Sequence, residues 1–351
     1  MIENEGLPTS FFYLGKILEK TGDSPVRNHT VFRNLIRLTL GIPGLINAIS
    51  QIKFQTKQFS PDFIIANGFK AHFLTSLAIK KKIPIIWYFQ DFLSNRKLVS
   101  KLLPCLVRSN TFLIADSKAV AKDLRLFFVN NKQFIWENTV DTSLFTPLLS
   151  SKKSVIKASG KCLKVGLVAT FARWKGHETF LRAAKKVKEQ FPYPIIFLVV
   201  GGPVYKSDES QWSMLELEKI AEVEGVRDIV EFTGFYNNMV DIYRELDIVV
   251  HASTAPEPFG QVIIESMACS KPVVVAAHGG ASEIGKPGHD LIHHVPGNCN
   301  SLAKAILELL YDEKLRKRIG VAARDTATKL YDISKVDERW FKIFSELEIN
   351  C

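Results

Sequence analysis

The chain has 351 residues, 46% of them hydrophobic and 23% charged, which is the composition of an ordinary globular protein. This length exceeds the size at which a single hydrophobic core stops growing, so we expect two domains. Five scattered cysteines without a C-x-x-C pair favour neither a disulfide framework nor a zinc site. No apolar stretch is long enough for a membrane span, and Glu3 and Glu5 stand where a signal peptide would be basic. We therefore expect a soluble protein of the reducing cytoplasm.

Positive charge is concentrated in the first half of the chain. Residues 1–150 contain 19 Lys and Arg against 10 Asp and Glu, or +9, whereas the remainder of the chain carries +1. Basic residues also lie among the leucines of Leu98–Leu106. This asymmetry predicts peripheral contact with an anionic membrane surface or a phosphorylated lipid, although simple solubility is the alternative. No zinc-finger spacing or RNA-recognition motif accompanies the charge, so nucleic acid is not the expected partner.

Strand patterns alternate with helical patterns, which indicates parallel sheets with crossover helices. The strands expected in the first half are Phe63–Ala66, Ile83–Phe89, Thr111–Ala115 and Phe134–Trp136. The alternation restarts at Lys164 with strands Val165–Phe171, Ile195–Val200, Ile229–Thr233, Ile248–His251 and Pro272–Ala276. Helices are expected between them at His177–Gln190, Ser213–Glu224, Met239–Glu245 and after Gly260. We predict an α/β fold of two doubly wound, Rossmann-like domains.

The domain boundaries follow from the Ser-, Lys- and Gly-rich segment between the two blocks. We expect a first domain over 1–149, a linker over 150–160, and a second domain over 161–334. A helix over 335–351 is expected to cross back to the first domain.

Candidate binding residues follow the strands of the second block, where ligands of doubly wound sheets bind. Arg173 and Lys175 precede a helix and are suited to neutralise phosphate, although cations in a solvated loop often have no such role. The other candidates in this block that follow strands are the pairs Gly201-Gly202 and Gly234-Phe235.

Two glutamates lie eight residues apart in the segment EPFGQVIIE, Glu257–Glu265, at a helix start. Gly260 permits close approach of a ligand, and a helix N-terminus favours phosphate. If the segment were fully helical, the carboxylates would be about 12 Å apart, too far for a hydrolase pair but suited to the two ends of a sugar nucleotide. The alternative is a surface helix with ordinary glutamates near its N-terminus, where acidic residues are favoured.

The segment Glu257–Glu283 resembles the signature of the family 4 glycosyltransferases, retaining enzymes of the GT-B fold whose two domains face each other across a cleft. The resemblance extends from about Gly6 to Phe344. Family members open with a strand and a glycine-rich loop, which Met1–Asn28 does not show. The resemblance therefore implies an incomplete first domain without about two strand–helix units, either because the sequence is truncated or because the domain is reduced. It implies that Glu257 contacts the donor sugar and that Glu265 contacts the ribose. The remaining implied donor contacts are the backbone of Phe259, Gly260 and Gln261 to sugar and diphosphate, Lys175 and Arg173 to diphosphate, Gly234 and Phe235 to the nucleobase, and Gly201 and Gly202 beside the cleft.

Two positions depart from the family pattern. The family's Arg usually lies five residues before the Lys, where this chain has Thr170, so Arg173 is a substitute candidate. Gln90 stands where the family often has a His near the sugar, and Gln cannot carry a proton. Asn138 matches a family segment before the linker. Gln90, Asp91 and Asn138 are the candidates for the acceptor side.

The resemblance implies a hexosyl transfer from a UDP- or GDP-linked sugar to a glycan or lipid-linked acceptor, with retention and without metal or cofactor. Two alternatives remain: a nucleotide-sugar-binding or partner subunit without turnover, and a nicotinamide oxidoreductase, which the absence of G-x-G-x-x-G after any strand disfavours. The histidines outside the strands are expected on the surface rather than at a metal: His278, His289, His293 and His294.

Overall fold

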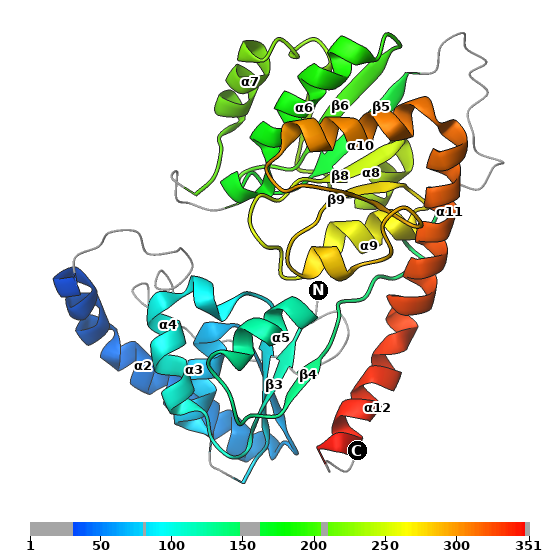
Figure 1. Cartoon of the computed structure of the whole chain (residues 1–351). Helices are drawn as coiled ribbons and strands as arrows, with labels where there is room; N and C mark the ends of the chain where they lie inside the picture. Colours follow the sequence, from blue (N-terminus) through cyan, green and yellow to red (C-terminus); the bar gives the residue numbers. More distant parts are fainter. Residues whose placement is uncertain (1–30, 80–81, 148–161, 205–209, 348–351) are drawn as a thin grey trace. The chain divides into compact units, whose positions relative to one another are not determined.

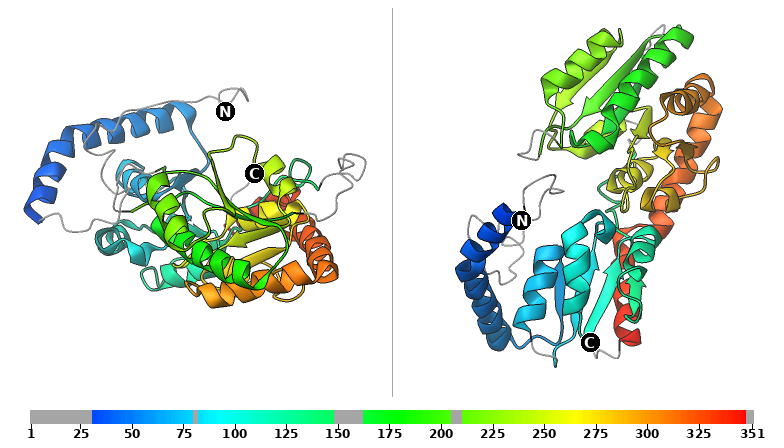
Figure 2. Two further views of the ribbon diagram at one scale, coloured as in Figure 1. Left: turned by 90° about the horizontal axis from the view of Figure 1, so that it is seen from above. Right: turned by 60° about the vertical axis from the view of Figure 1, so that its left-hand side comes forward.

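The structure, a computed structural model, describes residues 31–79, 82–147, 162–204 and 210–347, with side chains described from residue 42 onward. The chain divides into two compact units (Figures 1 and 2). Unit 1 comprises Met1–Asp116 and Val120–Ile135, and unit 2 comprises Ser117–Ala119 and Trp136–Cys351. The expected linker 150–160 and the segment Met1–Asn28 lie outside the described residues.

Unit 1 is built on a parallel sheet of four strands in the order β1-β2-β3-β4. Its strands are β1 Ile64–Asn67, β2 Ile85–Phe89, β3 Thr111–Ala115 and β4 Gln133–Ile135. The helices are α2 Val31–Phe59, α3 Phe69–Ala78, α4 Lys97–Leu102 and α5 Lys118–Arg125, with 3₁₀ turns η2 Leu93–Asn95 and η3 Leu103–Leu106. In β2, Ile85, Ile86 and Trp87 are all buried. Such a continuous apolar run is typical of a parallel strand covered on both faces.

Unit 2 is built on a parallel sheet of six strands in the order β10-β9-β8-β5-β6-β7. Its strands are β5 Leu163–Val168, β6 Ile195–Val200, β7 Val230–Gly234, β8 Ile248–His251, β9 Val273–Ala276 and β10 Ile292–His294. The helices are α6 His177–Gln190, α7 Met214–Val223, α8 Met239–Glu245, α9 Gln261–Ala268, α10 Cys299–Tyr311, α11 Glu313–Leu330 and α12 Val336–Glu346, with 3₁₀ turns η5 Arg173–Lys175, η6 Gly280–Glu283 and η7 Ile333–Lys335. The chain runs outward from β5 to one edge and then returns to β8 on the other side of β5. The reversal between β5 and β8 is the switch point at which doubly wound sheets bind ligands.

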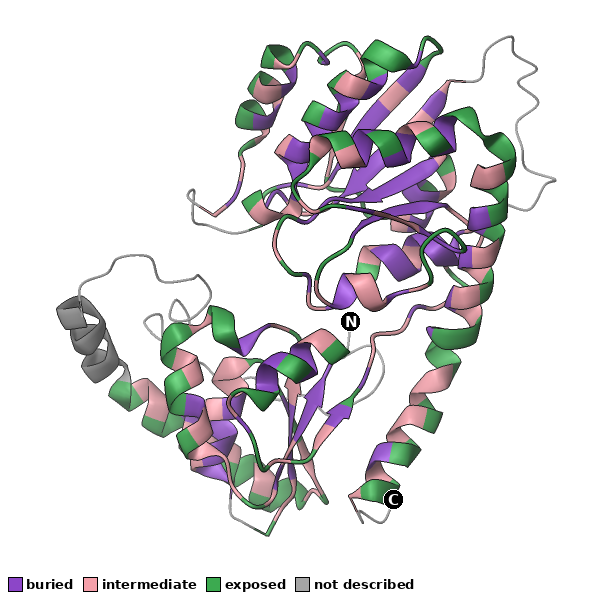
Figure 3. Cartoon of the chain, viewed as in Figure 1, coloured by how far each residue is buried: buried purple, intermediate pink, exposed green. Residues whose placement is uncertain are grey.

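Apolar side chains fill both faces of the unit 2 sheet, as the buried strands in Figure 3 show. Along β6 the side chains alternate, because successive residues of a strand point to opposite faces. Phe197 and Val199 pack in one core cluster, whereas Leu198 and Val200 pack in the other. Helix α6 adds Phe180 to the first cluster. The sheet is therefore held rigidly between two helical layers, which fixes the loops at its carboxyl edge.

The structure confirms the predicted α/β fold with parallel sheets. One strand was missed: β10, which pairs with β9 through His293 opposite Val275. The expectation of a surface loop is therefore wrong for His294, which is only 2% exposed, and His293 is half-buried. A three-residue edge strand carrying two histidines has too little β-propensity to stand out in a sequence. His278 and His289 are exposed, as expected. None of the described helices is long and apolar enough to cross a membrane.

Candidate functional site

The loops that follow β5 and β8 meet at the switch point of unit 2. Trp174 in the β5 loop accepts two hydrogen bonds through its carbonyl oxygen, from the Thr254 N–H at 2.7 Å and the Thr254 Oγ1 at 3.2 Å. Gly176 has φ +80°, and a Cβ there would lie 1.9 Å from the carbonyl oxygen of Ala252. Only glycine allows this approach. The β5 loop, which carries Lys175, is thereby fixed against the end of β8.

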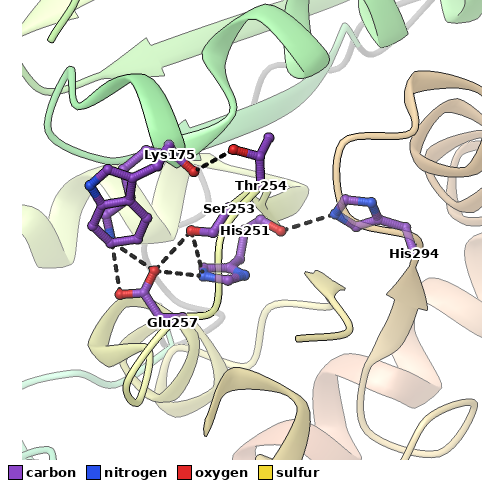
Figure 4. Close-up of polar contacts among 7 residues, drawn as sticks. Lys175, His251, Ser253, Thr254, Glu257 and His294 are labelled. Atoms are coloured by element: carbon purple, nitrogen blue, oxygen red, sulfur yellow. Dashed lines mark hydrogen bonds and ion pairs between the residues drawn. The ribbon is translucent and has the colours of Figure 1, made fainter. Parts of the chain in front are cut away.

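Lys175 and Glu257 form a two-pronged ion pair at this point (Figure 4). The Lys175 Nζ lies 2.8 Å from Glu257 Oε1 and 2.9 Å from Oε2. The same Nζ lies 4.1 Å from the ring centroid of Trp174, within cation–π distance. Glu257 is 8% exposed. A cation and a carboxylate from the loops after two different strands are thus brought together in a largely desolvated position.

Two further side chains hold Glu257. The Ser253 hydroxyl donates to Glu257 Oε2 at 2.8 Å, and His251 Nε2 lies 3.3 Å from the same oxygen. Ser253 and His251 also contact each other, at 3.1 Å. Both side chains are buried. With the His251 proton on Nε2, that nitrogen donates to the carboxylate, whereas Nδ1 is buried without a hydrogen-bond partner among the described residues.

These partners keep Glu257 ionised. Burial alone would raise the pKa of Glu257, but the His251 hydrogen bond, the Lys175 charge and the Lys175 hydrogen bond lower it to about 2. Opposite charge and hydrogen bonds to the charged form outweigh desolvation here. Glu257 is therefore a carboxylate at neutral pH.

The backbone of Glu257 is fixed from the other side by the loop after β9. The Gly280 N–H donates to the Glu257 carbonyl oxygen at 2.7 Å. Gly279 has φ +65°, and a Cβ there would lie 2.4 Å from the same oxygen. The predicted segment from Glu257 to Glu283 is thus one packed unit rather than a series of independent turns.

Helix α9 begins directly after this segment with Gly260 at its N-cap. Gly260 has φ +116°, and no side chain caps the helix start. Open backbone N–H groups at such a start favour an anion. Phe259 is buried against Tyr331, with ring centroids 5.9 Å apart. The Gln261 side chain donates to the Thr139 carbonyl at 3.1 Å, so the residues expected to contact donor phosphate are held by their neighbours.

Glu265 is the fifth residue of α9 and is half-buried. The Tyr243 hydroxyl of α8 donates to Glu265 Oε2 at 2.7 Å, and Tyr243 itself is fully buried. Burial raises the pKa of Glu265, partly offset by hydrogen bonds from Tyr243 and Gln261. Glu257 is therefore a buried carboxylate, whereas the half-buried Glu265 is compatible with both the donor-contact prediction and an ordinary helix glutamate.

Arg173 has different partners from Lys175. Its guanidinium pairs with Glu216 of α7 at 3.0 Å and lies 3.8 Å from the Trp212 ring centroid. Glu216 also completes a capping box with Ser213 at the start of α7. The structure therefore brings Lys175, not Arg173, to Glu257.

The predicted glycines after β6 and β7 adjoin each other. The Gly201 N–H donates to the Gly234 carbonyl oxygen at 3.0 Å. A Cβ on Gly202 would lie 2.6 Å from the Phe235 ring, whose side chain is 63% exposed. An exposed aromatic ring beside two glycines is suited to cover a flat ligand such as a nucleobase.

The acceptor-side candidates are divided between the two units. Gln90 and Asp91 follow β2 in unit 1, where Gln90 is exposed and Asp91 pairs with Arg96 at 3.2 Å. Asn138 belongs to unit 2 and is half-buried. Their role stays a prediction.

Sequence reasoning missed His251, Ser253 and Tyr243. A signal existed for the first two, since LDIVVHAS carries polar residues at alternate positions where an apolar strand ends. Tyr243 lies in an ordinary helical pattern and gave none. Within the described ranges, no group of three or more His, Cys, Asp or Glu side chains is placed to hold a metal ion.

A parallel sheet in Rossmann order, with a lysine–carboxylate pair at its switch point and an uncapped helix start, defines an α/β protein of nucleotide-binding type. The family follows from sequence comparison. Residues 151–326 match the glycosyl transferases group 1, and the chain belongs to that family.

Individual relatives agree with this membership. The sulfoquinovosyl transferase SQD2 of Arabidopsis thaliana is 27% identical over 350 residues, covering 94% of this chain and 63% of the relative. The N,N'-diacetylbacillosaminyl-diphospho-undecaprenol alpha-1,3-N-acetylgalactosaminyltransferase of Campylobacter jejuni is 25% identical over 346 residues, covering 96% and 81%. This chain therefore spans less than two thirds of the plant enzyme's length.

A solved structure shares the fold. Anabaena Alr3699/HepE, crystallised in complex with UDP and glucose, superposes with a TM-score of 0.74 at 24% identity, covering 86% of this chain and 81% of that one. At this identity the likeness shows the fold, which is that of the GT-B glycosyltransferases.

Proposed function

We propose that the protein transfers a hexose from a nucleotide diphosphate sugar to an acceptor hydroxyl. The observation that carries this proposal is the contact of Lys175 with both oxygens of Glu257 at the β5–β8 switch point. A cation suited to diphosphate thereby lies beside a carboxylate suited to sugar hydroxyls. Membership of the glycosyl transferases group 1 supports the same reaction class.

The other parts of the donor are assigned to residues around the Lys175–Glu257 pair. Lys175 and the open start of α9 at Phe259, Gly260 and Gln261 would hold the diphosphate, and Glu265 the ribose. The HepE complex with UDP and glucose supports a uridine nucleotide, and a GDP-linked sugar is the second donor to test. Gly234 and Phe235 would border the nucleobase, beside Gly201 and Gly202.

The reaction is proposed to be retaining, as in the family 4 enzymes that the signature resembles. Positive charge at Lys175 and the helix dipole of α9 would stabilise the leaving diphosphate. Arg173 would add a second cation after exchanging Glu216 for phosphate. In such a mechanism the leaving phosphate takes the acceptor's proton on the same face, so Gln90 in the place of a histidine is compatible with turnover. Phosphate charge is met by side chains and backbone, without a metal ion or cofactor.

The proposed acceptor is a glycan or a lipid-linked sugar, used in cell-envelope polysaccharide or glycolipid synthesis at the cytoplasmic face of a membrane. The diphospho-undecaprenol in the name of the Campylobacter relative supports a lipid-linked acceptor. Helix α4 of unit 1 supports membrane contact, because Leu98 and Leu102 are 61% and 50% exposed and each follows an exposed lysine, Lys97 and Lys101. Exposed leucines beside lysines favour contact with an anionic membrane surface.

The test is direct. Calorimetric titration with UDP-glucose, UDP-N-acetylglucosamine and GDP-mannose measures donor binding, and NMR of the product with glycan and lipid-linked acceptors gives the anomeric configuration. The replacement Glu257→Gln should reduce turnover more than nucleotide affinity. Donor binding without sugar transfer to any acceptor, and without release of nucleoside diphosphate, would favour the alternative, a nucleotide-sugar-binding partner subunit.

A further inference from the structure

The two oxygens of Glu257 are held unequally (Figure 4). Oε2 has three partners: Lys175 at 2.9 Å, Ser253 at 2.8 Å and His251 at 3.3 Å. Within the described part of the chain, Oε1 has a hydrogen bond only from Lys175, at 2.8 Å. Loss of Lys175 would therefore free Oε1 but leave Oε2 with two donors.

The proposed function gives Lys175 a second partner. Two of the three donors of its ammonium group are used by Glu257, so a diphosphate that binds Lys175 with more than one donor draws the ammonium away from the carboxylate. A carboxylate as buried as Glu257 would be strongly destabilised if it lost its cation and had no other partner. His251 and Ser253 provide hydrogen-bond donors that remain with Glu257 when the Lys175 ammonium group donates to phosphate instead.

We propose that His251 and Ser253 are positioning residues that anchor Oε2 of Glu257, so that Oε1 accepts a hydroxyl of the donor sugar when Lys175 binds the diphosphate. This inference rests on the proposed function. It adds that the two oxygens of Glu257 have different partners: Oε2 binds the protein, and Oε1 binds the sugar.

The surroundings of the two residues suit this role. His251 and Ser253 are 3% and 1% exposed, so water does not compete for their hydrogen bonds. The backbone at this strand end is fixed as well, because His294 Nε2 of β10 lies 3.1 Å from the His251 carbonyl oxygen. Trp174, which binds Thr254, fixes the next residue of the loop. Rigid support of this kind is what a binding carboxylate requires.

Four variants test the proposal in the full-length chain. His251→Leu and Ser253→Ala each remove one donor to Oε2, whereas His251→Gln retains an N–H donor at similar length. Ser76→Ala is the matched control, because Ser76 is a buried serine of α3 in unit 1 that donates only to the His72 carbonyl among the contacts of the described chain. Melting temperatures verify that each variant is folded.

The readout is the sugar gain, the dissociation constant for UDP divided by that for UDP-glucose, with GDP and GDP-mannose as a second pair. We expect His251→Leu and Ser253→Ala to lower the sugar gain about tenfold while UDP affinity changes less than about twofold. His251→Gln should restore most of the gain, and Ser76→Ala should leave it unchanged. The rate of slow donor hydrolysis without acceptor should fall in parallel.

Two outcomes overturn the inference while the donor site stands. One is an unchanged sugar gain and hydrolysis rate in both donor-removing variants, and the other is an equal loss of affinity for UDP and UDP-glucose. Failure of the wild-type protein to bind either nucleotide pair would instead refute the proposed function. The wild type therefore tests the donor site, and the variants test the positioning role.

Discussion

Lys175 reaches both oxygens of Glu257 across 82 residues of sequence, from the loop after β5 to the loop after β8. The contact joins the two central strands at the point where the order of the sheet reverses. Because both side chains are largely buried, neither charge can be removed without leaving the other poorly solvated. The pair thus links the stability of unit 2 to the proposed donor site.

The first prediction is that Lys175→Met lowers affinity for UDP much more than affinity for uridine. A charge that faces phosphate acts on the diphosphate and not on the bare nucleoside, and one charge-assisted hydrogen bond contributes about 1.5–3 kcal/mol. Calorimetric titration with both ligands measures the difference. Lys188→Met is the control, because Lys188 pairs with Asp228 on the exposed surface of unit 2. Equal losses for UDP and uridine would place Lys175 away from the phosphates.

The second prediction concerns pH. Despite burial, the His251 hydrogen bond and the Lys175 charge lower the folded-state pKa of Glu257 to about 2, below its ordinary value of 4.5. The folded state thus binds the proton less tightly than the unfolded state, so the stabilisation is complete above pH 4.5 and disappears as the pH falls through about 2. Its size is on the order of 3 kcal/mol at neutral pH.

Urea unfolding of wild type and Glu257→Gln between pH 7 and pH 3.5 measures this contribution. The difference in the free energy of unfolding should be largest at pH 7 and should shrink below about pH 4.5. A difference that stays constant over this range would mean that the charge of Glu257 is not what the surrounding groups stabilise.

Much of the fold was readable because packing in parallel sheets leaves strong patterns. Strands Thr111–Ala115, Ile195–Val200 and Ile248–His251 were predicted to the residue, since each is a buried apolar run bounded by polar or turn residues. The helices His177–Gln190 and Met239–Glu245 were also predicted to the residue. Strand β10 escaped because its identity comes from pairing with β9 and not from its own composition.

The position of the site in the fold could be predicted from the sequence, but the side-chain contacts within the site could not. Sequence order placed Lys175 and Glu257 at the carboxyl edge of one sheet, yet only the structure shows that they pair directly. Arg173 was a substitute candidate for a second phosphate ligand because it precedes the same helix as Lys175, but cation–π contact with Trp212 and the charge of Glu216 draw its guanidinium to α7. Side-chain partners of this kind depend on tertiary packing, which periodicity does not encode.

The third prediction is that Glu265→Ala and Tyr243→Phe both weaken UDP binding without unfolding the protein. Glu265 is expected to accept from the ribose hydroxyls, and the Tyr243 hydrogen bond of 2.7 Å holds its carboxylate in place. Loss of Glu265 should cost about 1.5–3 kcal/mol, and loss of the single phenol hydroxyl about 1 kcal/mol. Titration with UDP and with 2',3'-dideoxy-UDP separates the effects. Full effects with the dideoxy nucleotide would exclude a ribose contact.

The fourth prediction is that Arg173→Ala lowers UDP affinity less than Lys175→Met does. The guanidinium must leave Glu216 and the Trp212 ring before it can reach phosphate, and a partly exposed ion pair with a cation–π contact resists that move by about 1 kcal/mol. Calorimetric titration of the two variants under the same conditions decides. A loss in Arg173→Ala as large as in Lys175→Met would make Arg173 an equal phosphate ligand.

The final prediction is that unit 1 binds anionic membranes through α4. Each Lys or Arg near such a surface contributes roughly 1 kcal/mol, and inserted leucines add apolar burial, so a few residues suffice for reversible binding. Co-sedimentation of the full chain with liposomes that contain phosphatidylserine should therefore weaken as salt shortens the Debye length.

Replacement of Lys97 and Lys101 by Glu should abolish the salt-sensitive part of the binding, and Leu98→Glu with Leu102→Glu should weaken binding at every salt concentration. Leu126→Glu is the matched control, because Leu126 is 72% exposed elsewhere in unit 1. Binding that is insensitive to salt, or unchanged in the α4 variants, would reduce the charge asymmetry of the chain to a contribution to solubility.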